Sequence, residues 1–374
     1  MLTLNFNIFK MTIKNVTDYI EKLAPLYYAE SFDNVGLLVG NPNTKISNVL
    51  VCLDTLEETV DEAIAKKCNL IISFHPIIFN GLKKITGTSY VERVVLKAIK
   101  NDISIYATHT ALDNSKNGVS SKICDVLGLK NKTVLIPKKG IIKKLTTYIP
   151  KEQASFVREA LFKVNKNNLG NYSDASFNVL GKGTFKGNEK STPTYGEKNK
   201  LHTEEEIKLT LLFESKDEFT ILKTLKEKHP YEEVAYEVTT IDNIHQDIGM
   251  GMIGEFKKEM DEKTFLNYLK KTMKTNCVRH SAFLGKNIKK VAVLGGAGSF
   301  AIDTAKRVGA DAYISADFKY HDFFKAEKSI LLADIGHYES EQFTKNLLVD
   351  YLTKKFSNFA VILSEKSTNP IYYI

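Results

Sequence analysis

Short apolar runs alternate with amphipathic segments over most of this chain, and that alternation limits the fold more than any other feature. The runs 48–54, 69–75 and 102–110 are typical of buried strands, and the segments between them carry apolar residues at helical spacing. Strands that alternate with helices build a sheet with many parallel neighbours and helices on its faces. The same pattern returns after residue 288, so we predict an α/β fold at both ends of the chain.

The middle of the chain follows a different pattern. From about residue 138 to 243 the predicted order is strand, helix, strand, strand, helix, strand, which is the ferredoxin-like order. We therefore expect three segments: a first α/β half over 11–137, an inserted α+β domain over 138–243, and a second α/β half over 244–374.

Composition narrows the class of protein. Of the 374 residues, 43% are hydrophobic and 26% are charged, as in ordinary globular proteins. The net charge of +8 comes from scattered lysines, so we expect no nucleic-acid partner.

The cysteines and the N-terminal segment indicate the compartment. The four cysteines are far apart, so we expect reduced thiols. No apolar run is long enough to cross a membrane, and residues 1–10 lack the features of a signal peptide, so we expect a cytoplasmic protein. Met11 is an alternative start of the chain.

The stretch "LIISFHPIIF" places a histidine where a buried run ends. His75 precedes a proline, which stops the hydrogen-bond ladder of a strand. Polar groups at the carboxyl ends of parallel strands form the sites of α/β sheets. Taken alone, His75 is either a core histidine bonded to a backbone carbonyl or a site residue.

Two more histidines share this context. His109 and His337 each end an apolar run, and each has an acidic residue four positions later, Asp113 and Glu341. Because parallel strands place their carboxyl ends at one edge, these groups are candidates to converge. Imidazole and carboxylate donors suit Zn²⁺, Mn²⁺ or Fe²⁺. From spacing alone, two interpretations remain open: a shared divalent-metal site, or a set of unrelated surface pairs.

Five ordered motifs make the chain similar to a known family. They resemble the Nif-three-like family (NGG-one-interacting factor three), whose members are homologues of a type 2 GTP cyclohydrolase I. The resemblance implies a layered α/β sandwich of two related halves, a toroidal homohexamer, one or two metal ions per subunit, and a PII-like or CutA-like inserted domain. The motifs are "LAPLYYAESFDNVGLLVG" (23–40), "ISFHPIIF" (72–79), "THTALDNSKNGVS" (108–120), "ADFKYHD" (316–322) and "ADIGHYESE" (333–341).

The resemblance also implies a ligand set. His75, Asp113 and Glu341 would hold one metal, and His337 with Glu341 would belong to the second. The family has two adjacent histidines before the proline. This chain has Phe74 in place of the first histidine and keeps the second as His75. We expect this change to weaken the second site, and we hypothesise that His109 completes it.

Three further landmarks have two readings each. His321, in "ADFKYHD" after Asp317, is either a general acid or base or a group that orients a ligand. "FDNVGLLVG" is either a turn or a wall of the site, and "LGGAGS" (294–299) indicates close strand-to-helix packing more than a phosphate loop.

Two functions remain in competition. The first is a metal-dependent hydrolase in which Glu341 and His321 would be catalytic, acting on a small-molecule substrate that the family label makes GTP. The second is a non-catalytic protein for metal storage, delivery or regulation. A DNA-binding toroid is supported by net charge only.

Overall fold

The computed structural model describes residues 11–165 and 172–374. The expectation that Met11 is an alternative start concerns residues 1–10, which lie outside the described residues. Two compact units make up the chain: unit 1 joins Met1–Pro137 to Gln246–Ile374, and unit 2 is Lys138–His245. Among the described residues, no helix has the length and hydropathy needed to cross a membrane.

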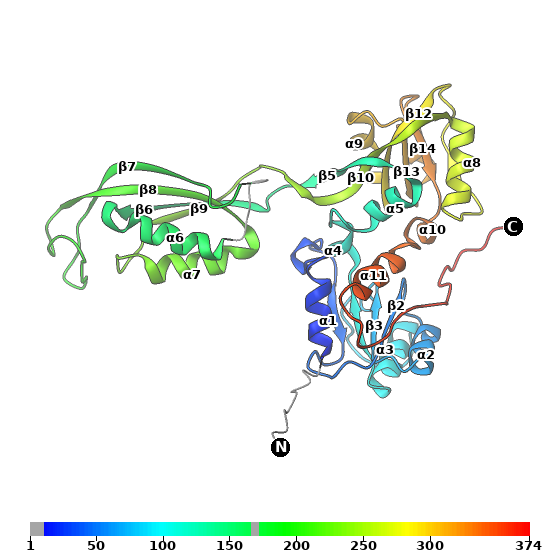
Figure 1. The fold of residues 1–374 in the computed structure, drawn as a ribbon, viewed down its shortest axis with the longest axis horizontal. Coiled ribbons are helices and arrows are strands. Elements are labelled where there is room, and N and C mark those ends of the chain that lie inside the picture. The colour runs from blue at the N-terminus through cyan, green and yellow to red at the C-terminus, as the bar shows by residue number, and fades with distance from the viewer. Residues whose placement is uncertain (1–10, 166–171) are drawn as a thin grey trace, which may run out of the picture. The chain divides into compact units, whose positions relative to one another are not determined.

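The first part of unit 1 is built around a sheet in the order β1-β4-β3-β2-β15. Strands β4, β3, β2 and β15 run parallel, and β1 pairs with β4 in the antiparallel sense. Helices α2 and α3 cover one face, and α1 and α11 lie on the other side (Figure 1). The elements are α1 (Ile13–Ile20), η1 (Leu26–Tyr28), β1 (Gly36–Val39), β2 (Val49–Cys52), α2 (Glu57–Ala65), β3 (Leu70–Ser73), α3 (Tyr90–Lys100), β4 (Ser104–Ala107), α4 (His109–Asp113), α5 (Val119–Leu127), α11 (Thr344–Thr353) and β15 (Val361–Leu363).

The second part of unit 1 repeats this plan. Its sheet has the order β11-β14-β13-β12-β10-β5, and β14, β13 and β12 again run parallel beside an antiparallel edge strand. The elements are β5 (Lys130–Lys138), β10 (His245–Asp261), α8 (Glu262–Thr272), β11 (Arg279–His280), β12 (Asn287–Ala297), η4 (Ser299–Ala301), α9 (Ile302–Arg307), β13 (Ala312–Ala316), η5 (Tyr320–Ala326), β14 (Leu331–Asp334) and α10 (His337–Glu341).

The register of the parallel strands places polar residues side by side. Cys52 of β2 lies opposite Ser73 of β3, and Ser73 lies opposite Ala107 of β4. Two residues beyond each of these positions stand Asp54, His75 and His109, respectively. The three polar side chains therefore leave neighbouring strands at the same edge of the sheet.

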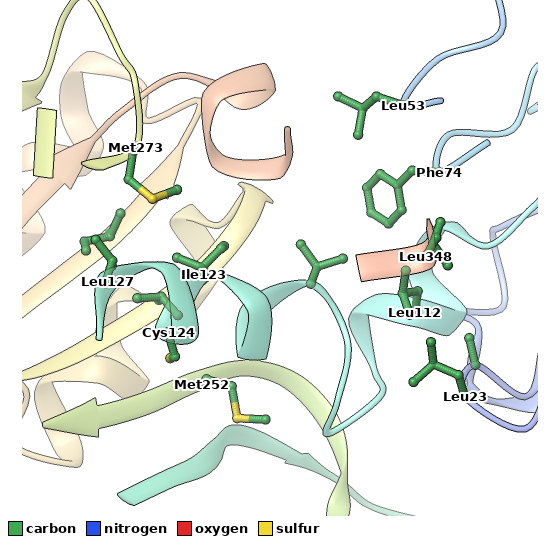
Figure 2. Close-up of a cluster of buried hydrophobic side chains, with 14 of the residues drawn as sticks. Leu23, Leu53, Phe74, Leu112, Ile123, Cys124, Leu127, Met252, Met273 and Leu348 are labelled. Carbon is green, nitrogen blue, oxygen red and sulfur yellow. The ribbon is translucent and has the colours of Figure 1, made fainter. Parts of the chain in front are cut away.

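A single hydrophobic cluster joins the two sheets of unit 1. It takes residues from β2, β3, α4 and α11 and also from α5, α8, β12 and β13. Figure 2 shows part of this cluster, with Leu53 and Phe74 near Leu112 and Leu348, and with Ile123 and Leu127 of α5 near Met273. Both sheets share this core, so the burial of its apolar surface holds the two sheets together, including the edges at which their parallel strands end.

Unit 2 has the strand order β7-β8-β6-β9, with antiparallel neighbours throughout. Together with two helices that share one core, this is the ferredoxin-like arrangement expected from the sequence. The elements are β6 (Ile142–Pro150), η2 (Lys151–Gln153), α6 (Ala154–Val164), β7 (Ser176–Phe185), β8 (His202–Glu214), η3 (Ser215–Asp217), α7 (Glu218–Lys228) and β9 (Tyr236–Thr240).

Two phenylalanines of unit 2 test this core. Phe213 is fully buried on β8, whereas Phe219 on α7 is 79% exposed. We expect Phe213→Ala to lower the free energy of unfolding by about 3–5 kcal/mol, because it leaves a cavity. Phe219→Ala should change it by about 0.5 kcal/mol or less. Urea denaturation of both variants measures the difference, and equal losses would contradict the assigned core.

Candidate metal centre

Two histidines from the two sheets face one carboxylate. His75 follows β3, while His337 and Glu341 are the first and last residues of α10. The Nε2 atoms of His75 and His337 lie 3.2 and 3.3 Å from the same atom, Oε2 of Glu341. One ligand atom from each of the three residues lies within 4.8 Å of the other two, so this cluster could hold a metal ion.

The shared oxygen of Glu341 is buried without a hydrogen bond. Among the residues that the structure describes, none donates a hydrogen bond to Glu341 Oε2. A buried carboxylate oxygen that has ion-pair contacts but no hydrogen bond is incompletely satisfied. Two nitrogens aimed at a buried oxygen are the donor set expected around a divalent cation, so the residues present fit a metal ion.

Each imidazole is held from behind by another carboxylate. Nδ1 of His75 lies 2.8 Å from Oδ1 of Asp54, and Nδ1 of His337 lies 2.7 Å from Oδ2 of Asp317. A carboxylate only accepts hydrogen bonds, so Nδ1 donates and the Nε2 of a neutral ring keeps its lone pair for the cluster. Carboxylates in this position fix the orientation and tautomer of metal-binding histidines.

The charges of the three residues are strongly coupled. Burial by itself would raise the pKa of Glu341, but His337 and His75 outweigh it and lower that pKa to about 2. Burial opposes a charge on His75, yet Asp54 and Glu341 raise its pKa to about 10. Glu341 is also the main reason that the pKa of His337 rises to about 9. The cluster is therefore a place where positive charge is stabilised.

Two glycines of β12 allow two helices to approach this strand closely. A Cβ on Gly296 would clash with Oε1 of Glu341 on α10, and a Cβ on Gly295 would lie 2.7 Å from a methyl group of Val119 on α5. Gly296 also has a φ of +70°, which favours glycine, and its N–H donates to Ser340 Oγ. The motif "LGGAGS" thus serves close strand-to-helix packing against the candidate metal centre.

His109 repeats the arrangement of His337. It begins the five-residue helix α4, which ends at Asp113, as His337 begins α10 and Glu341 ends it. Its Nδ1 lies 2.7 Å from Oδ1 of Asp33, and the other oxygen of Asp33 accepts hydrogen bonds from the N–H and hydroxyl of Thr110. The backbone of His109 has a φ of +25°, a strained value of the kind that occurs at functional sites.

A pocket of about 200 Å³ connects these groups. Asp113 lies in its wall, and burial, reinforced by the negative charge of Glu341, raises the pKa of this carboxyl well above its usual range. The remaining wall is mainly apolar or glycine. The lining residues are Phe32, His109, Thr110, Asp113, Ser120, Met250, Gly251, Leu294, Gly295, Gly296, Ala297, Phe300, His337 and Glu341.

Phe74 is a core residue. Its side chain is fully buried, and it belongs to the hydrophobic cluster of Figure 2. Its ring also contacts His75 and His109, with centroid distances of 4.9 and 5.6 Å. At the position where the resemblance implies a first histidine, this chain therefore places an apolar ring that packs against two histidines.

The structure brings most of the expected site residues to one place and leaves one outside. His109, Asp113, His337 and Glu341 line the pocket, and His75 joins the cluster through Glu341. His321 is an exposed residue of η5 that contacts Tyr320 and Phe324, and it is not part of the pocket wall. Its acid-base role stays a prediction.

Sequence reasoning missed two of the three supporting carboxylates. Asp54 was recognisable, because it is the last residue of the predicted strand 48–54, just as His75 is the last residue of the predicted strand 69–75. Asp33 lies in "FDNVGLLVG", which the sequence marked as a turn or a wall of the site, but nothing local predicted that it would reach His109 from 76 positions away in the chain. The segment "FDNVGLLVG" therefore both turns and supports the site.

A matched pair of glycine variants tests the packing of α10. Gly296 and Gly285 have nearly the same φ, +70° and +69°, but nothing lies within 4 Å of a Cβ at Gly285. We expect Gly296→Ala to displace Glu341 and to lower Zn²⁺ affinity by about tenfold or more, the range for loss of a supporting contact. Gly285→Ala carries the same backbone penalty and should bind Zn²⁺ like the parent. Calorimetric titration decides, and equal affinities would contradict the role of Gly296.

Comparisons with known proteins agree with this architecture. The family model described as Duf34/NIF3 (NGG1p interacting factor 3) matches residues 11–370. A Bacillus subtilis protein named "GTP cyclohydrolase 1 type 2 homolog" is 36% identical over 368 residues, which cover 96% of this chain and 98% of that protein.

Solved structures give the same answer. The crystal structure of a Bacillus cereus protein related to NIF3 superposes with a TM-score of 0.79 at 34% identity and covers 98% of this chain and 100% of that one. A Staphylococcus aureus structure reaches a TM-score of 0.78 at 28% identity, covering 97% of this chain and 99% of that one. On the strength of a match that spans nearly the whole chain, this protein belongs to the Duf34/NIF3 family.

Proposed function

We propose that this chain binds divalent metal ions at the cluster of His75, His337 and Glu341 and uses them as a metal-dependent hydrolase. The observation that carries the proposal is the buried Oε2 of Glu341, which has an imidazole nitrogen on each side and no hydrogen bond among the described residues. An ion pair alone would leave that oxygen poorly satisfied, whereas a cation would use all three donors.

The chemistry of the donors limits the metal. Two imidazole nitrogens and one carboxylate suit Zn²⁺, Mn²⁺ or Fe²⁺. A bound ion of this kind acts as a Lewis acid and lowers the pKa of a coordinated water. The part of the protein would be to hold the two rings in the required tautomer through Asp54 and Asp317 and to keep Glu341 charged.

His109 and Asp113 are proposed ligands for a second ion, with Glu341 shared between the two. The support is that His109, Asp113 and Glu341 line one pocket and that Asp33 holds the ring of His109 from behind. The resemblance would instead pair His75 with Asp113, but His75 shares an oxygen of Glu341 with His337. We therefore assign His75 to the first ion.

The substrate is proposed to be a small molecule that enters the pocket. The relatives' name suggests GTP, and the pocket offers Phe32 and Phe300 as exposed aromatic walls. Among the described residues that line it, none is lysine or arginine, so the pocket itself supplies no side-chain cation for a triphosphate. This weighs against GTP and leaves the hydrolase class in place.

A second function is favoured by one observation. Phe74 fills the position of an expected ligand with a buried apolar ring. Loss of a ligand should impair two-metal hydrolysis more than the retention of one ion, so metal storage, delivery or regulation is the alternative. The homohexamer implied by the resemblance is part of either proposal.

Metal stoichiometry tests the ligand assignment. We expect Mn²⁺ titration of the chelator-treated protein to show a strong and a weak phase. His109→Ala should remove only the weak phase and Glu341→Gln should remove both, because Glu341 contributes to each ion. His280→Ala, at an exposed histidine of β11, is the matched control. An unchanged titration in His109→Ala would refute the second site.

Turnover separates the hydrolase from the alternative. The metal-loaded protein is assayed with a panel of nucleotides and phosphoesters, and products are resolved by chromatography. We expect turnover that Glu341→Gln abolishes and that Glu58→Gln, an exposed glutamate of α2, leaves unchanged. A protein that binds metal but converts nothing in the panel would favour storage or regulation.

A further inference from the structure

The segment that follows β15 contacts the supports of both metal-binding histidines. Thr368 is a buried threonine whose hydroxyl donates to Oδ2 of Asp54, the carboxylate that holds His75. The next residue, Asn369, donates from its side-chain amide to Oε1 of Glu339, at 3.0 Å. Glu339 is buried and lies between His337 and Glu341 on α10.

This segment starts from a fixed point on the first sheet. The N–H of Ser364 donates to Val51 of β2, its hydroxyl donates to Glu62, and the N–H of Glu365 donates to the other oxygen of Glu62. Residues 365–367 are exposed, and the chain becomes buried again at Thr368. Residues 364–369, which we call the C-terminal strap, thus run from the sheet that carries His75 to the helix that carries His337.

The contact with Asp54 has a specific consequence. The terminal torsion of an aspartate has only a broad intrinsic preference, so the contacts of its two oxygens set the plane of the carboxylate. In Asp54 one oxygen holds Nδ1 of His75 and the other accepts from Thr368. Without the hydroxyl, the carboxylate is free to turn, and the ring of His75 loses its fixed direction.

The contact with Glu339 acts on the other half of the site. Helix α10 has five residues, which is too short to be stable by itself. Pro370 restricts Asn369 to extended backbone and so reduces the freedom of its side-chain anchor. The hydrogen bond from Asn369 therefore helps to hold the helix that presents two of the three ligand atoms.

We infer that Thr368 and Asn369 are positioning residues, and that the C-terminal strap sets the geometry of the metal centre by fixing Asp54 and α10 together. The inference rests on the proposed metal-binding function. In this inference the C-terminal strap controls the metal affinity of the cluster, although none of its residues is a metal ligand.

Three variants of adjacent hydroxyls test the contact with Asp54. Thr368→Val keeps the shape and removes the hydroxyl, Thr368→Ser keeps the hydroxyl, and Ser367→Ala removes an exposed hydroxyl one residue away. Co²⁺ titration is followed by the visible absorption bands of the bound ion. We expect Thr368→Val to weaken Co²⁺ binding by about 10- to 100-fold and to shift the bands. Thr368→Ser and Ser367→Ala should match the parent in both readouts.

The results separate the strap from the function on which it rests. If the parent binds Co²⁺ and Thr368→Val has the same affinity and spectrum, the strap inference is wrong and the metal site stands. If the parent binds no Co²⁺, the proposed function fails, and hydrogen exchange in the metal-free protein decides about the strap. Thr368→Val should then raise exchange at the amides of Phe74 and His75, and Asn369→Ala should raise it in α10. Exchange equal to the parent would overturn the inference.

Discussion

A carboxylate buried between two imidazoles is the interaction on which the rest of this structure depends. A lone buried charge is too costly to persist, so Glu341 requires positive partners. His75 and His337 supply them from different sheets of unit 1, and each is held by its own aspartate. The centre therefore exists only while the shared hydrophobic core keeps the two sheets together.

The two parts of unit 1 use one structural device twice. In each, a parallel strand leads into a five-residue helix that starts with histidine and ends with an acid: His109 to Asp113 and His337 to Glu341. In each, an aspartate accepts from Nδ1 of the first residue. The device places one imidazole nitrogen and one carboxylate on the same side of a short helix, and both copies line one pocket.

Phe74 shows how the surroundings decide what a strand-end residue does. The strand direction is the same for Phe74 and His75, but successive side chains point to opposite faces. Phe74 points into the apolar cluster with Leu53 and Leu112, and His75 points toward Asp54 and Glu341. At the position of an expected ligand, the apolar ring of Phe74 stabilises the core beneath the centre. The number of metal ions that the centre can hold is therefore linked to how this core is packed.

The sequence alone determined the elements and the identity of the main donors. Periodicity revealed the parallel strands and the ferredoxin-like order of unit 2, and the strand-end positions singled out His75, His109 and His337, because both signals are local. The sequence alone could not predict hydrogen-bond partners that come together only when distant segments of the chain approach each other. Asp33 meets His109, and Thr368 meets Asp54, only after the chain has folded over 76 and 314 positions. Which nitrogen faces which oxygen is decided by packing, since the closeness of α10 to Gly296 and the burial of Phe74 are properties of the assembled core.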